Sequence, residues 1–244
     1  MRIDQYVTEK NNITKNKAQA MIKAGAILVN NKIITKCGFM VKETDEIEIS
    51  ETEESKYVSR SAIKLKKYFE NFPQKLTGKT ALDIGSSTGG FCQILLENEI
   101  QKIYAVDVGT SQLHQTLRNK GEIVSLENTD IRDLRLLPEK IDIITCDVSF
   151  IKLEMILDAI IYHIQENTKC FLLFKPQFEV GKNFVNKKGV VKNDKYTIRE
   201  LNNFLDICRA KGLKILQVEN SEMKGENGNQ EIFIELIKKE IEKK

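Results

Sequence analysis

The sequence contains no tryptophan, three prolines and two histidines among its 244 residues, and its five cysteines stand far apart. The scarcity of proline favours long helices and strands with short connections. No Cys-x-x-Cys motif occurs, and only His114 and His163 could add ligands, so the sequence argues against a structural zinc site. We therefore expect no bound metal. Reduced thiols of a cytoplasmic protein are expected at Cys37, Cys92, Cys146, Cys170 and Cys208.

We also expect neither an export signal nor a membrane-spanning segment. Residues 1–12 are polar and include Asp4 and Glu9, so they do not form the apolar core of a signal peptide. The longest apolar runs, such as residues 170–174, have the length of a strand and fall far short of the ~20 residues of a membrane helix. Basic and acidic residues nearly balance, 38 against 35, and the net charge of +3 indicates no partner by itself.

Charge is distributed unevenly in the first quarter of the chain. Seven lysines and no acid occur between residues 10 and 42, and seven acids follow between residues 43 and 54. The acidic run also contains serine and threonine, a composition typical of a linker. With 41% hydrophobic residues the chain can form one or two folded domains. We expect a small N-terminal domain with its linker over residues 1–55 and a larger domain over residues 56–244.

The first part of the chain has the signals of a small α+β unit. Thr14 is suited to cap a helix over residues 15–24, which Gly25 would end. A tight turn is expected at Asn30-Asn31. Short strands are expected at residues 26–29, 33–34 and 45–49.

The lysines of this part have two interpretations, a solvated surface or a face that binds nucleic-acid phosphates, and the absence of acids among them favours phosphate binding. The segment resembles the small RNA-binding domain first described in a ribosomal protein of the small subunit, through residues 2–4, 14–22, 25–30 and 45–47. Members usually carry Ser-Arg where this chain has Asn16-Lys17, which keeps the charge and loses the bidentate guanidinium. RNA contacts are expected from Lys15, Lys17, Lys23, Lys32, Lys36 and Arg60.

From residue 80 onward, strand-like and helix-like segments alternate. Such alternation is typical of an α/β fold with a doubly wound, mostly parallel sheet, here of seven strands. The last two strands follow each other without a helix, so the final strand is expected to run antiparallel. The expected strands cover residues 80–84, 102–108, 123–126, 141–146, 170–175, 214–219 and 231–237. Helices are expected over residues 90–98, 111–119, 153–165 and about 193–211.

The first of these strands runs into a stretch of small residues, 85–90, that precedes a helix. Small residues allow the backbone to approach a ligand at the carboxyl edge of the sheet. Asp107, at the end of the next strand, stands 22 residues after Gly85 and can accept both hydroxyls of a ribose. These features predict a nucleotide-type cofactor, for which S-adenosylmethionine and a dinucleotide are both candidates.

Two observations favour S-adenosylmethionine. Ser87 occupies the place of the second glycine in the dinucleotide motif G-x-G-x-x-G. The Asp83 carboxylate suits a cationic ligand better than a pyrophosphate, and S-adenosylmethionine carries an ammonium and a sulfonium. Asp130 has two interpretations of about even weight, a contact to the adenine amino group and a helix cap. Cofactor contacts are expected from Asp83, Gly85, Ser86, Ser87, Thr88, Gly89, Gly90, Phe91, Asp107, Val108, Asp130 and Ile131.

Four charged residues are expected to converge at the same edge of the sheet. Lys64 precedes the first strand, Asp147 and Lys175 end the fourth and fifth strands, and Glu231 opens the last. Each of them alone would more often be a surface charge or half of a salt bridge. Together, beside a cofactor, they suit the removal of a proton from a weakly acidic alcohol. An exposed lysine is protonated at neutral pH, so a lysine base requires burial and a second nearby cation.

The motifs around these residues resemble those of the TlyA, or hemolysin A, family of ribosomal RNA 2′-O-methyltransferases, whose catalytic domain is FtsJ-like. The resemblance extends over essentially the whole chain and rests on residues 59–65, 83–91, 147–151, 175–179 and 224–231. Two departures are visible: Ser61-Ala62 replaces the more usual Gly-Gly, and the loop over residues 181–191 is rich in Asn and Lys.

The resemblance implies a Rossmann-like class I methyltransferase fold with S-adenosylmethionine as methyl donor. It places Lys64, Asp147, Lys175 and Glu231 on the catalytic tetrad of the family, with Lys175 as the base. The implied substrate is a cytidine 2′-hydroxyl in large-subunit 23S rRNA, with small-subunit 16S rRNA as an additional candidate. We expect a cytoplasmic monomer that acts on a ribosomal subunit, without membrane attachment.

Three other functions compete with this one. Amino-directed base methyltransferases use Asn/Asp-Pro-Pro-aromatic where this chain has Asp147-Val148-Ser149-Phe150, and a cytosine-carbon methyltransferase needs a nucleophilic cysteine, whereas Cys146 lies within a strand. A non-catalytic rRNA-binding assembly factor would need only the RNA domain, and the complete tetrad argues against it. A hemolysin is disfavoured because no export signal or spanning segment is visible.

Overall fold

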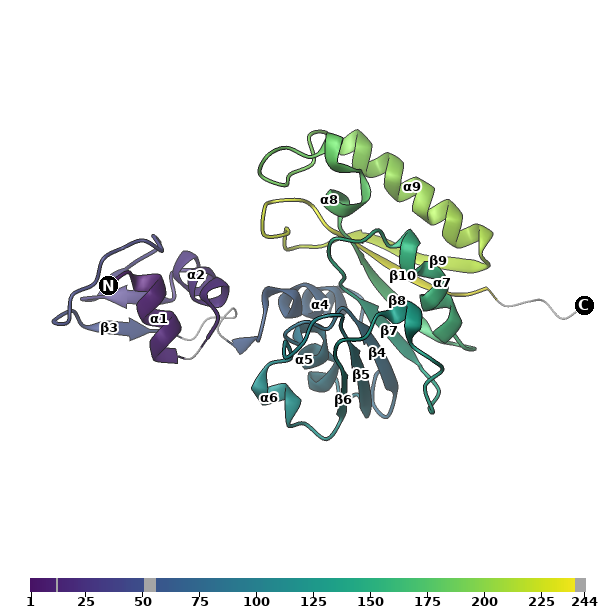
Figure 1. Ribbon diagram of the computed structural model, residues 1–244, viewed down its shortest axis with the longest axis horizontal. Coiled ribbons are helices and arrows are strands. Elements are labelled where there is room, and N and C mark those ends of the chain that lie inside the picture. The colour runs from purple at the N-terminus through teal and green to yellow at the C-terminus, as the bar shows by residue number, and fades with distance from the viewer. Residues whose placement is uncertain (12, 51–55, 240–244) are drawn as a thin grey trace, which may run out of the picture. The chain divides into compact units, whose positions relative to one another are not determined.

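The computed structural model describes residues 1–11, 13–50 and 56–239. The chain divides into two compact units, Met1–Ile63 and Lys64–Lys244, and the division falls within helix α4 (Arg60–Asn71). Figure 1 shows both units. The linker expected around residues 51–55 lies outside the described residues.

In its described residues up to residue 50, the N-terminal unit forms two helices and a three-stranded antiparallel sheet. Its sheet has the strand order β2-β1-β3. The helix and strands predicted after residue 14 are present, with ends shifted by one or two residues, whereas helix α1 is not among the predicted elements. The elements are α1 (Ile3–Asn11), α2 (Lys15–Lys23), β1 (Ile27–Val29), β2 (Lys32–Ile33) and β3 (Ile47–Ile49).

Local signals explain most of this unit. The Thr14 hydroxyl accepts the backbone N–H of Lys17 at 3.3 Å and caps α2, as predicted. Asn30 and Asn31 adopt φ values of 49° and 63°, the left-handed backbone that a tight hairpin turn requires. Helix α1 gives a weak signal because it is polar overall. Its buried Asp4 accepts hydrogen bonds from Arg2 and from Gln19 of α2.

The second unit carries the predicted alternation of strands and helices (Figure 1). Its strands are β4 (Thr80–Ile84), β5 (Lys102–Val106), β6 (Ile123–Leu126), β7 (Ile143–Cys146), β8 (Lys169–Phe174), β9 (Leu213–Asn220) and β10 (Ile232–Lys238). Its helices, besides α4, are α5 (Gly90–Glu97), α6 (Gln115–Arg118), η1 (Ile131–Asp133), α7 (Glu154–His163), α8 (Pro176–Glu179), η2 (Lys182–Phe184) and α9 (Asp194–Ala210).

The seven strands form one sheet with the order β6-β5-β4-β7-β8-β10-β9. Strands β4 to β8 pair in parallel, and β10 pairs antiparallel with both β8 and β9, which confirms the predicted direction of the last strand. The chain leaves β4 toward β5 and β6 and later returns to the other side of β4 with β7. The carboxyl ends of β4 and β7 therefore form the topological switch point at which such sheets bind ligands.

Both faces of the sheet are covered by helices. On one face, α7 and α9 contribute Leu157, Ile160, Phe204 and Cys208 to a continuous apolar core with the strands. On the other face, aromatic rings of α4 and α5 contact those of the sheet. Tyr68, Phe69 and Phe91 lie within 4.6–6.2 Å, between ring centroids, of Phe171 or Phe233. This three-layer packing holds the carboxyl edge of the sheet rigid.

Two segments differ from the predicted elements. The helix expected over residues 111–119 is reduced to α6, because the Glu127 carboxylate accepts the backbone N–H groups of Ser111, Gln112 and Leu113 and so holds residues 111–113 outside the helix. The long loop expected before α9 contains two short helices, α8 and η2. Pro176, whose ring presets the backbone for a first helical position, opens α8.

Candidate functional site

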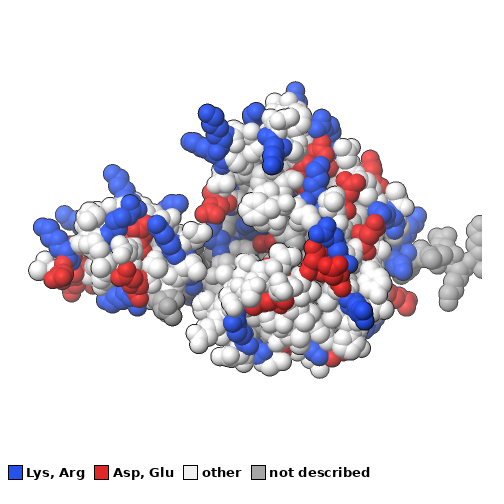
Figure 2. Space-filling model, viewed as in Figure 1, with Lys and Arg blue, Asp and Glu red and all other residues white. Residues whose placement is uncertain are grey.

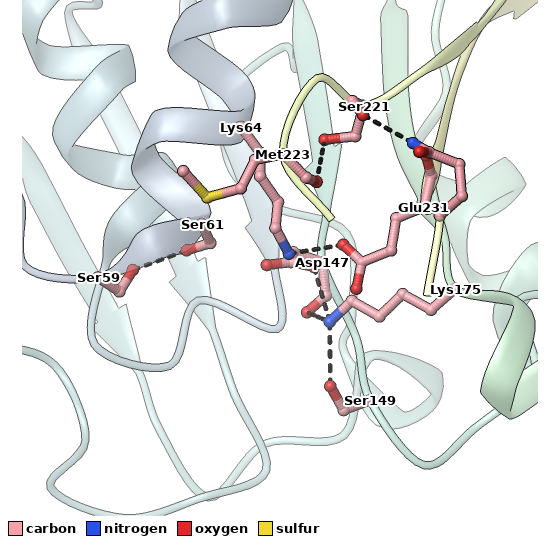
Figure 3. Close-up of polar contacts among 10 residues, drawn as sticks. Ser59, Ser61, Lys64, Asp147, Ser149, Lys175, Ser221, Met223 and Glu231 are labelled. Atoms are coloured by element: carbon pink, nitrogen blue, oxygen red, sulfur yellow. Dashed lines mark hydrogen bonds and ion pairs between the residues drawn. The ribbon is translucent and has the colours of Figure 1, made fainter. Parts of the chain in front are cut away.

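The four residues of the predicted tetrad converge at the carboxyl edge of the sheet (Figure 3). Lys175 follows β8 and Glu231 precedes β10, and the end pair of these antiparallel strands is Phe174 with Ile232. The two residues therefore stand opposite each other at the end of the ladder. Asp147 follows β7, the parallel neighbour of β8. Lys64 reaches the same place from the first turns of α4.

The tetrad consists of two ion pairs that are largely removed from water. Lys64 Nζ lies 2.5 Å from Glu231 Oε2, and Lys175 Nζ lies 2.8 Å from Asp147 Oδ1. Lys64 and Lys175 are only 8% and 9% exposed. Two cations and two carboxylates make the group neutral, which is the condition for burying charges without a large desolvation penalty.

Backbone contacts fix the position of Glu231. Its carbonyl accepts the N–H of Ser221 at 2.8 Å, which folds the connection between β9 and β10 back on itself. Gly225 lies against the carboxylate: a Cβ atom at this position would stand 2.5 Å from Glu231 Oε1. A larger residue at this position would have to displace the Glu231 carboxylate.

The segment after β7 carries two residues to which the sequence analysis assigns no role. Ser149 accepts a hydrogen bond from Lys175 Nζ at 3.0 Å, so the amine is oriented by a hydroxyl as well as by Asp147. Phe150 is 90% exposed and adopts φ of 66°, an unfavourable backbone for a bulky residue. Its ring lies 5.0 Å, between centroids, from that of Phe178. An aromatic residue in the loop that follows a strand end is the sequence signal that could have identified Phe150.

Glu179 joins the segments that follow β7 and β8. Its buried carboxyl group accepts the backbone N–H of Leu153 at 2.9 Å, just before α7. Burial raises the pKa of Glu179 to about 7, and the negative charges of Glu200 and Glu154 add to the rise. The Leu153 N–H and Lys152 act in the opposite direction and lower this pKa. Glu179 therefore links the loop that carries Asp147 to the loop that carries Lys175.

The loop after β4 approaches the segment after β7 closely. Gly85 has φ of 77°, and a Cβ atom there would stand 3.0 Å from Val148 and 3.1 Å from the Asp147 carbonyl oxygen. Ser87 is also left-handed, with φ of 47°. This backbone leads into α5 at the switch point of the sheet. The left-handed turn of this loop and the start of α5 fit a nucleoside-type cofactor, the class of ligand that this position binds in doubly wound sheets.

The two aspartates predicted to serve the cofactor have different surroundings. The Asp107 carboxylate accepts the N–H groups of Ser87 at 2.8 Å and Gly109 at 2.7 Å. A carboxylate has about four acceptor sites, so two remain for the hydroxyls of a ribose. Asp83 is 1% exposed and accepts hydrogen bonds from Thr145 and Cys92. Burial raises the pKa of Asp83 to about 6.

Several other predicted cofactor residues have side chains that are buried or paired within the chain. Asp130 caps η1 and pairs with Arg132 at 2.6 Å, which is the helix-cap interpretation of the sequence. The side chain of Phe91 is buried and stacks on Phe233, so only its backbone faces the loop. Ile131 is buried and Val108 is 69% exposed. Ser86, Gly89 and Gly90 are buried, and Thr88 is half-buried.

Cys146, the cysteine nearest the tetrad, has the properties of a core residue. It is fully buried in β7, and burial raises the pKa of its thiol well above the usual range. A thiol in this state is a poor nucleophile. The structure therefore disfavours the cytosine-carbon methyltransferase alternative.

The lysines predicted to contact RNA lie on the surface of the N-terminal unit. Lys15, Lys23, Lys32 and Lys36 are exposed, whereas Lys17 is half-buried and burial lowers its pKa. Within the described residues none of these lysines forms an ion pair. Arg60 is half-buried at the start of α4.

In the part of the chain that the structure describes, no group of three or more His, Cys, Asp or Glu side chains is arranged to hold a metal ion. Among the same residues, no helix has the length and apolar character needed to cross a membrane.

Comparison with protein families gives two matches. Residues 57–238 match the FtsJ-like methyltransferase family, and residues 1–47 match the S4 domain.

Three individual proteins are similar over most of the chain. The 23S rRNA (cytidine-2′-O)-methyltransferase TlyA of Campylobacter jejuni is 42% identical over 98% of this chain and all of its own length. The 16S/23S rRNA (cytidine-2′-O)-methyltransferase TlyA of Mycobacterium tuberculosis is 33% identical, over 91% of this chain and 83% of its own. A solved structure from Streptococcus thermophilus, described provisionally as a hemolysin, superposes with a TM-score of 0.77 at 28% identity, over 98% of this chain and 89% of its own.

Replacing Glu179 by Gln should remove a pH dependence of stability. The pKa of Glu179 is raised from its ordinary 4.5 to about 7 by folding, so the folded chain binds this proton more tightly than the unfolded chain does. The free energy of unfolding therefore falls as pH rises from about 4.5 to about 7 and is constant above that range. Glutamine can accept the same N–H and does not titrate.

At each pH we compare the free energy of unfolding of Glu179→Gln with that of the wild type. The difference, variant minus wild type, should increase by about 2–3 kcal/mol between pH 5 and pH 8. Urea unfolding at each pH measures this difference. Glu166→Gln, an exposed change in the turn after α7, serves as the control and should show no such trend. Parallel stability curves for Glu179→Gln and wild type would contradict the prediction.

Proposed function

The chain belongs to the TlyA family of FtsJ-like methyltransferases, and from this premise we propose that it transfers the methyl group of S-adenosylmethionine to the 2′-hydroxyl of a cytidine in ribosomal RNA. The observation that carries the proposal is the buried cluster of Lys64, Glu231, Lys175 and Asp147 at the switch point of the sheet. Large-subunit 23S rRNA is the proposed substrate, and 16S rRNA is the additional candidate. Such an enzyme works where ribosomes are, in the cytoplasm.

Lys175 is the proposed base. A ribose hydroxyl is a weak nucleophile until its proton is removed, and an amine at the end of a rigid strand can take that proton. Asp147 and Ser149 orient the amine, at 2.8 Å and 3.0 Å. Lys64 and Glu231 complete the neutral cluster and hold it against α4 and β10.

S-adenosylmethionine would supply an electrophilic methyl group beside the tetrad. We propose that the loop after β4 and the ends of β5 and β6 hold it. Asp107 would accept its ribose hydroxyls, while the buried Asp83 would act through its negative charge. The proposed contacts are Asp83, Gly85, Ser86, Ser87, Thr88, Gly89, Gly90, Phe91, Asp107, Val108, Asp130 and Ile131, with Phe91 contributing through its backbone.

The two domains would then have different roles. Residues 1–55 would bind rRNA with Lys15, Lys17, Lys23, Lys32 and Lys36, and residues 56–244 would carry out the transfer. Arg60, at the start of α4, would add one more contact to the RNA. The match of residues 1–47 to the S4 domain and the unpaired surface lysines there support this assignment.

The central experiment is mass mapping of ribose methylation on purified, unmethylated 50S and 30S subunits incubated with the protein and S-adenosylmethionine. A new 2′-O-methylcytidine in 23S rRNA is the expected product. Methylation of a base, or of no nucleotide in either subunit, would refute the proposal, and a product in 16S rRNA as well would establish the broader substrate range.

Lys175→Ala should lower the rate of methyl transfer by about 100-fold or more, since general-base catalysis contributes on the order of 10²–10⁴. Binding of S-adenosylmethionine should be nearly unchanged. Single-turnover methylation at saturating cofactor measures the rate. Lys152→Ala, which removes a lysine of the β7–α7 connection with only a 3.9 Å ion pair, is the control. A wild-type rate in Lys175→Ala would contradict the assignment of Lys175 as the base, and catalysis would then depend mainly on how the enzyme orients the reactants.

Asp107→Ala should weaken S-adenosylmethionine binding by about 10-fold or more, the effect of losing a hydrogen bond to a charged group. Calorimetry gives the affinity, and circular dichroism shows whether the variant remains folded. Asp206→Ala, an exposed change on α9, provides the matched control. Unchanged affinity in folded Asp107→Ala, or tight NAD binding by the wild type, would disprove the cofactor assignment.

Replacing Lys15, Lys23 and Lys32 together by Gln should weaken binding to the large subunit and flatten its dependence on salt. Each phosphate contact that is lost reduces the slope of log affinity against log salt by about 0.7–0.9. Filter binding at several KCl concentrations measures the slope. If the slope does not change, the RNA contacts of the chain lie elsewhere.

A further inference from the structure

The loop between α8 and α9 concentrates lysines that the tetrad does not use. Residues 180–199 contain five lysines and one arginine but a single acid, Asp194. Lys182, Lys187, Lys188 and Lys192, together called the lysine loop below, are all exposed. None of the four has an ion-pair partner among the residues that the structure describes.

Lysines elsewhere in the same unit are often neutralised. Lys102 pairs with Glu139 at 2.5 Å, and Lys211 pairs with Asp158 at 2.6 Å. Four neighbouring cations without acids repel one another and attract anions from outside the chain. The lysine loop is therefore a candidate for an anionic partner.

This segment is a folded structure that presents its lysines in a defined arrangement. Val185 and Val191 form an antiparallel bridge, and the Asn186 N–H donates to the Val190 carbonyl at 2.8 Å. The Asn186 side chain accepts the N–H groups of Lys188 and Val190. Ordering has thus been achieved before a partner binds, which lowers the entropic penalty of binding.

Aromatic packing fixes the base of the loop. The rings of Phe184 and Tyr196 lie 4.3 Å apart between centroids, and the Arg199 guanidinium lies 5.4 Å from the centre of the Phe184 ring. Lys195 lies over Tyr196 at 5.4 Å. Figure 2 shows Lys and Arg gathered over the region where Figure 1 places this loop and the start of α9.

One side chain fastens the loop to the segment of the tetrad glutamate. Asn229 is buried, and it stands two residues before Glu231. Its carbonyl oxygen accepts the Val191 N–H at 2.9 Å, and its amide donates to the Gly189 carbonyl at 2.8 Å. The lysines are therefore held on the same side of the sheet as the site of chemistry.

We propose that the lysine loop binds phosphates of the rRNA that flank the methylated nucleotide. The inference rests on the proposed function. An RNA fits better than an acidic protein because residues 181–192 expose no large apolar side chain that could anchor a protein interface. Isolated cations on a fixed loop are what contact to a phosphate backbone requires.

The test compares three variants of the full chain with the wild type. In the first, Lys182, Lys187, Lys188 and Lys192 are replaced by Gln, and in the second by Arg. The control variant replaces four exposed lysines near the starts of strands, at the opposite edge of the sheet, by Gln. These control positions are Lys75, Lys120, Lys140 and Lys214.

Affinity for 50S subunits and for protein-free 23S rRNA is measured at several KCl concentrations, together with methyl transfer. The Gln variant of the lysine loop should bind both probes about 10-fold or more weakly at low salt, with a salt slope reduced by about two to three. Its kcat at saturating subunit and its affinity for S-adenosylmethionine should stay within about twofold of wild type. The Arg variant should restore most of the binding, and the control variant should retain it.

Equal losses in the lysine-loop and control variants, or no loss in either, would overturn the inference. Loss of binding to 50S subunits with unchanged binding to protein-free 23S rRNA would also overturn it, because the loop would then contact a ribosomal protein. The proposed function is judged separately by the wild type. A wild type that binds 23S rRNA without methylating it would contradict the proposed function and leave the RNA contact of the loop in place.

Discussion

Burial of four charges at one edge of the sheet is the constraint on which the catalytic unit depends. A single buried lysine or carboxylate without a partner is destabilising by several kcal/mol, and a pair becomes tolerable only when its geometry is close. Lys64 with Glu231 and Lys175 with Asp147 meet this condition at 2.5 Å and 2.8 Å. Because the four side chains come from α4, β7, β8 and the start of β10, these elements must all be in register before any of the charges is compensated.

The antiparallel strand is what makes this arrangement possible. In a purely parallel sheet only carboxyl ends of strands meet at one edge, and a residue that precedes a strand lies at the opposite edge. Since β10 runs against β8, Glu231 arrives beside Lys175 although it opens its strand. Gly225 and the Ser221 N–H then hold the turn before β10 against Glu231, so the connection between β9 and β10 serves the site as well as the fold.

Much of this could be predicted from the sequence, because the strongest signals are local. Strands β4 and β6 match the predicted ranges, and the convergence of the tetrad follows from strand ends in a doubly wound sheet. Three features required tertiary information. Glu127 shortens α6 by competing for backbone N–H groups, Asp130 bonds to Arg132, and Phe91 turns its ring into the core. Their residue types alone do not distinguish these environments from contacts with a ligand.

A neutral, buried tetrad has a consequence for how an RNA reaches it. The fields of opposite charges that lie 2.5–2.8 Å apart nearly cancel outside the cluster, so the tetrad itself attracts a polyanion weakly. Affinity for rRNA must then come from cations that lack a partner in the chain. Among the described residues, lysines without an ion-pair partner occur on the N-terminal unit and on the loop before α9. If these lysines bind the phosphates, as we propose, the charge state of the tetrad lysines can vary without loss of RNA affinity.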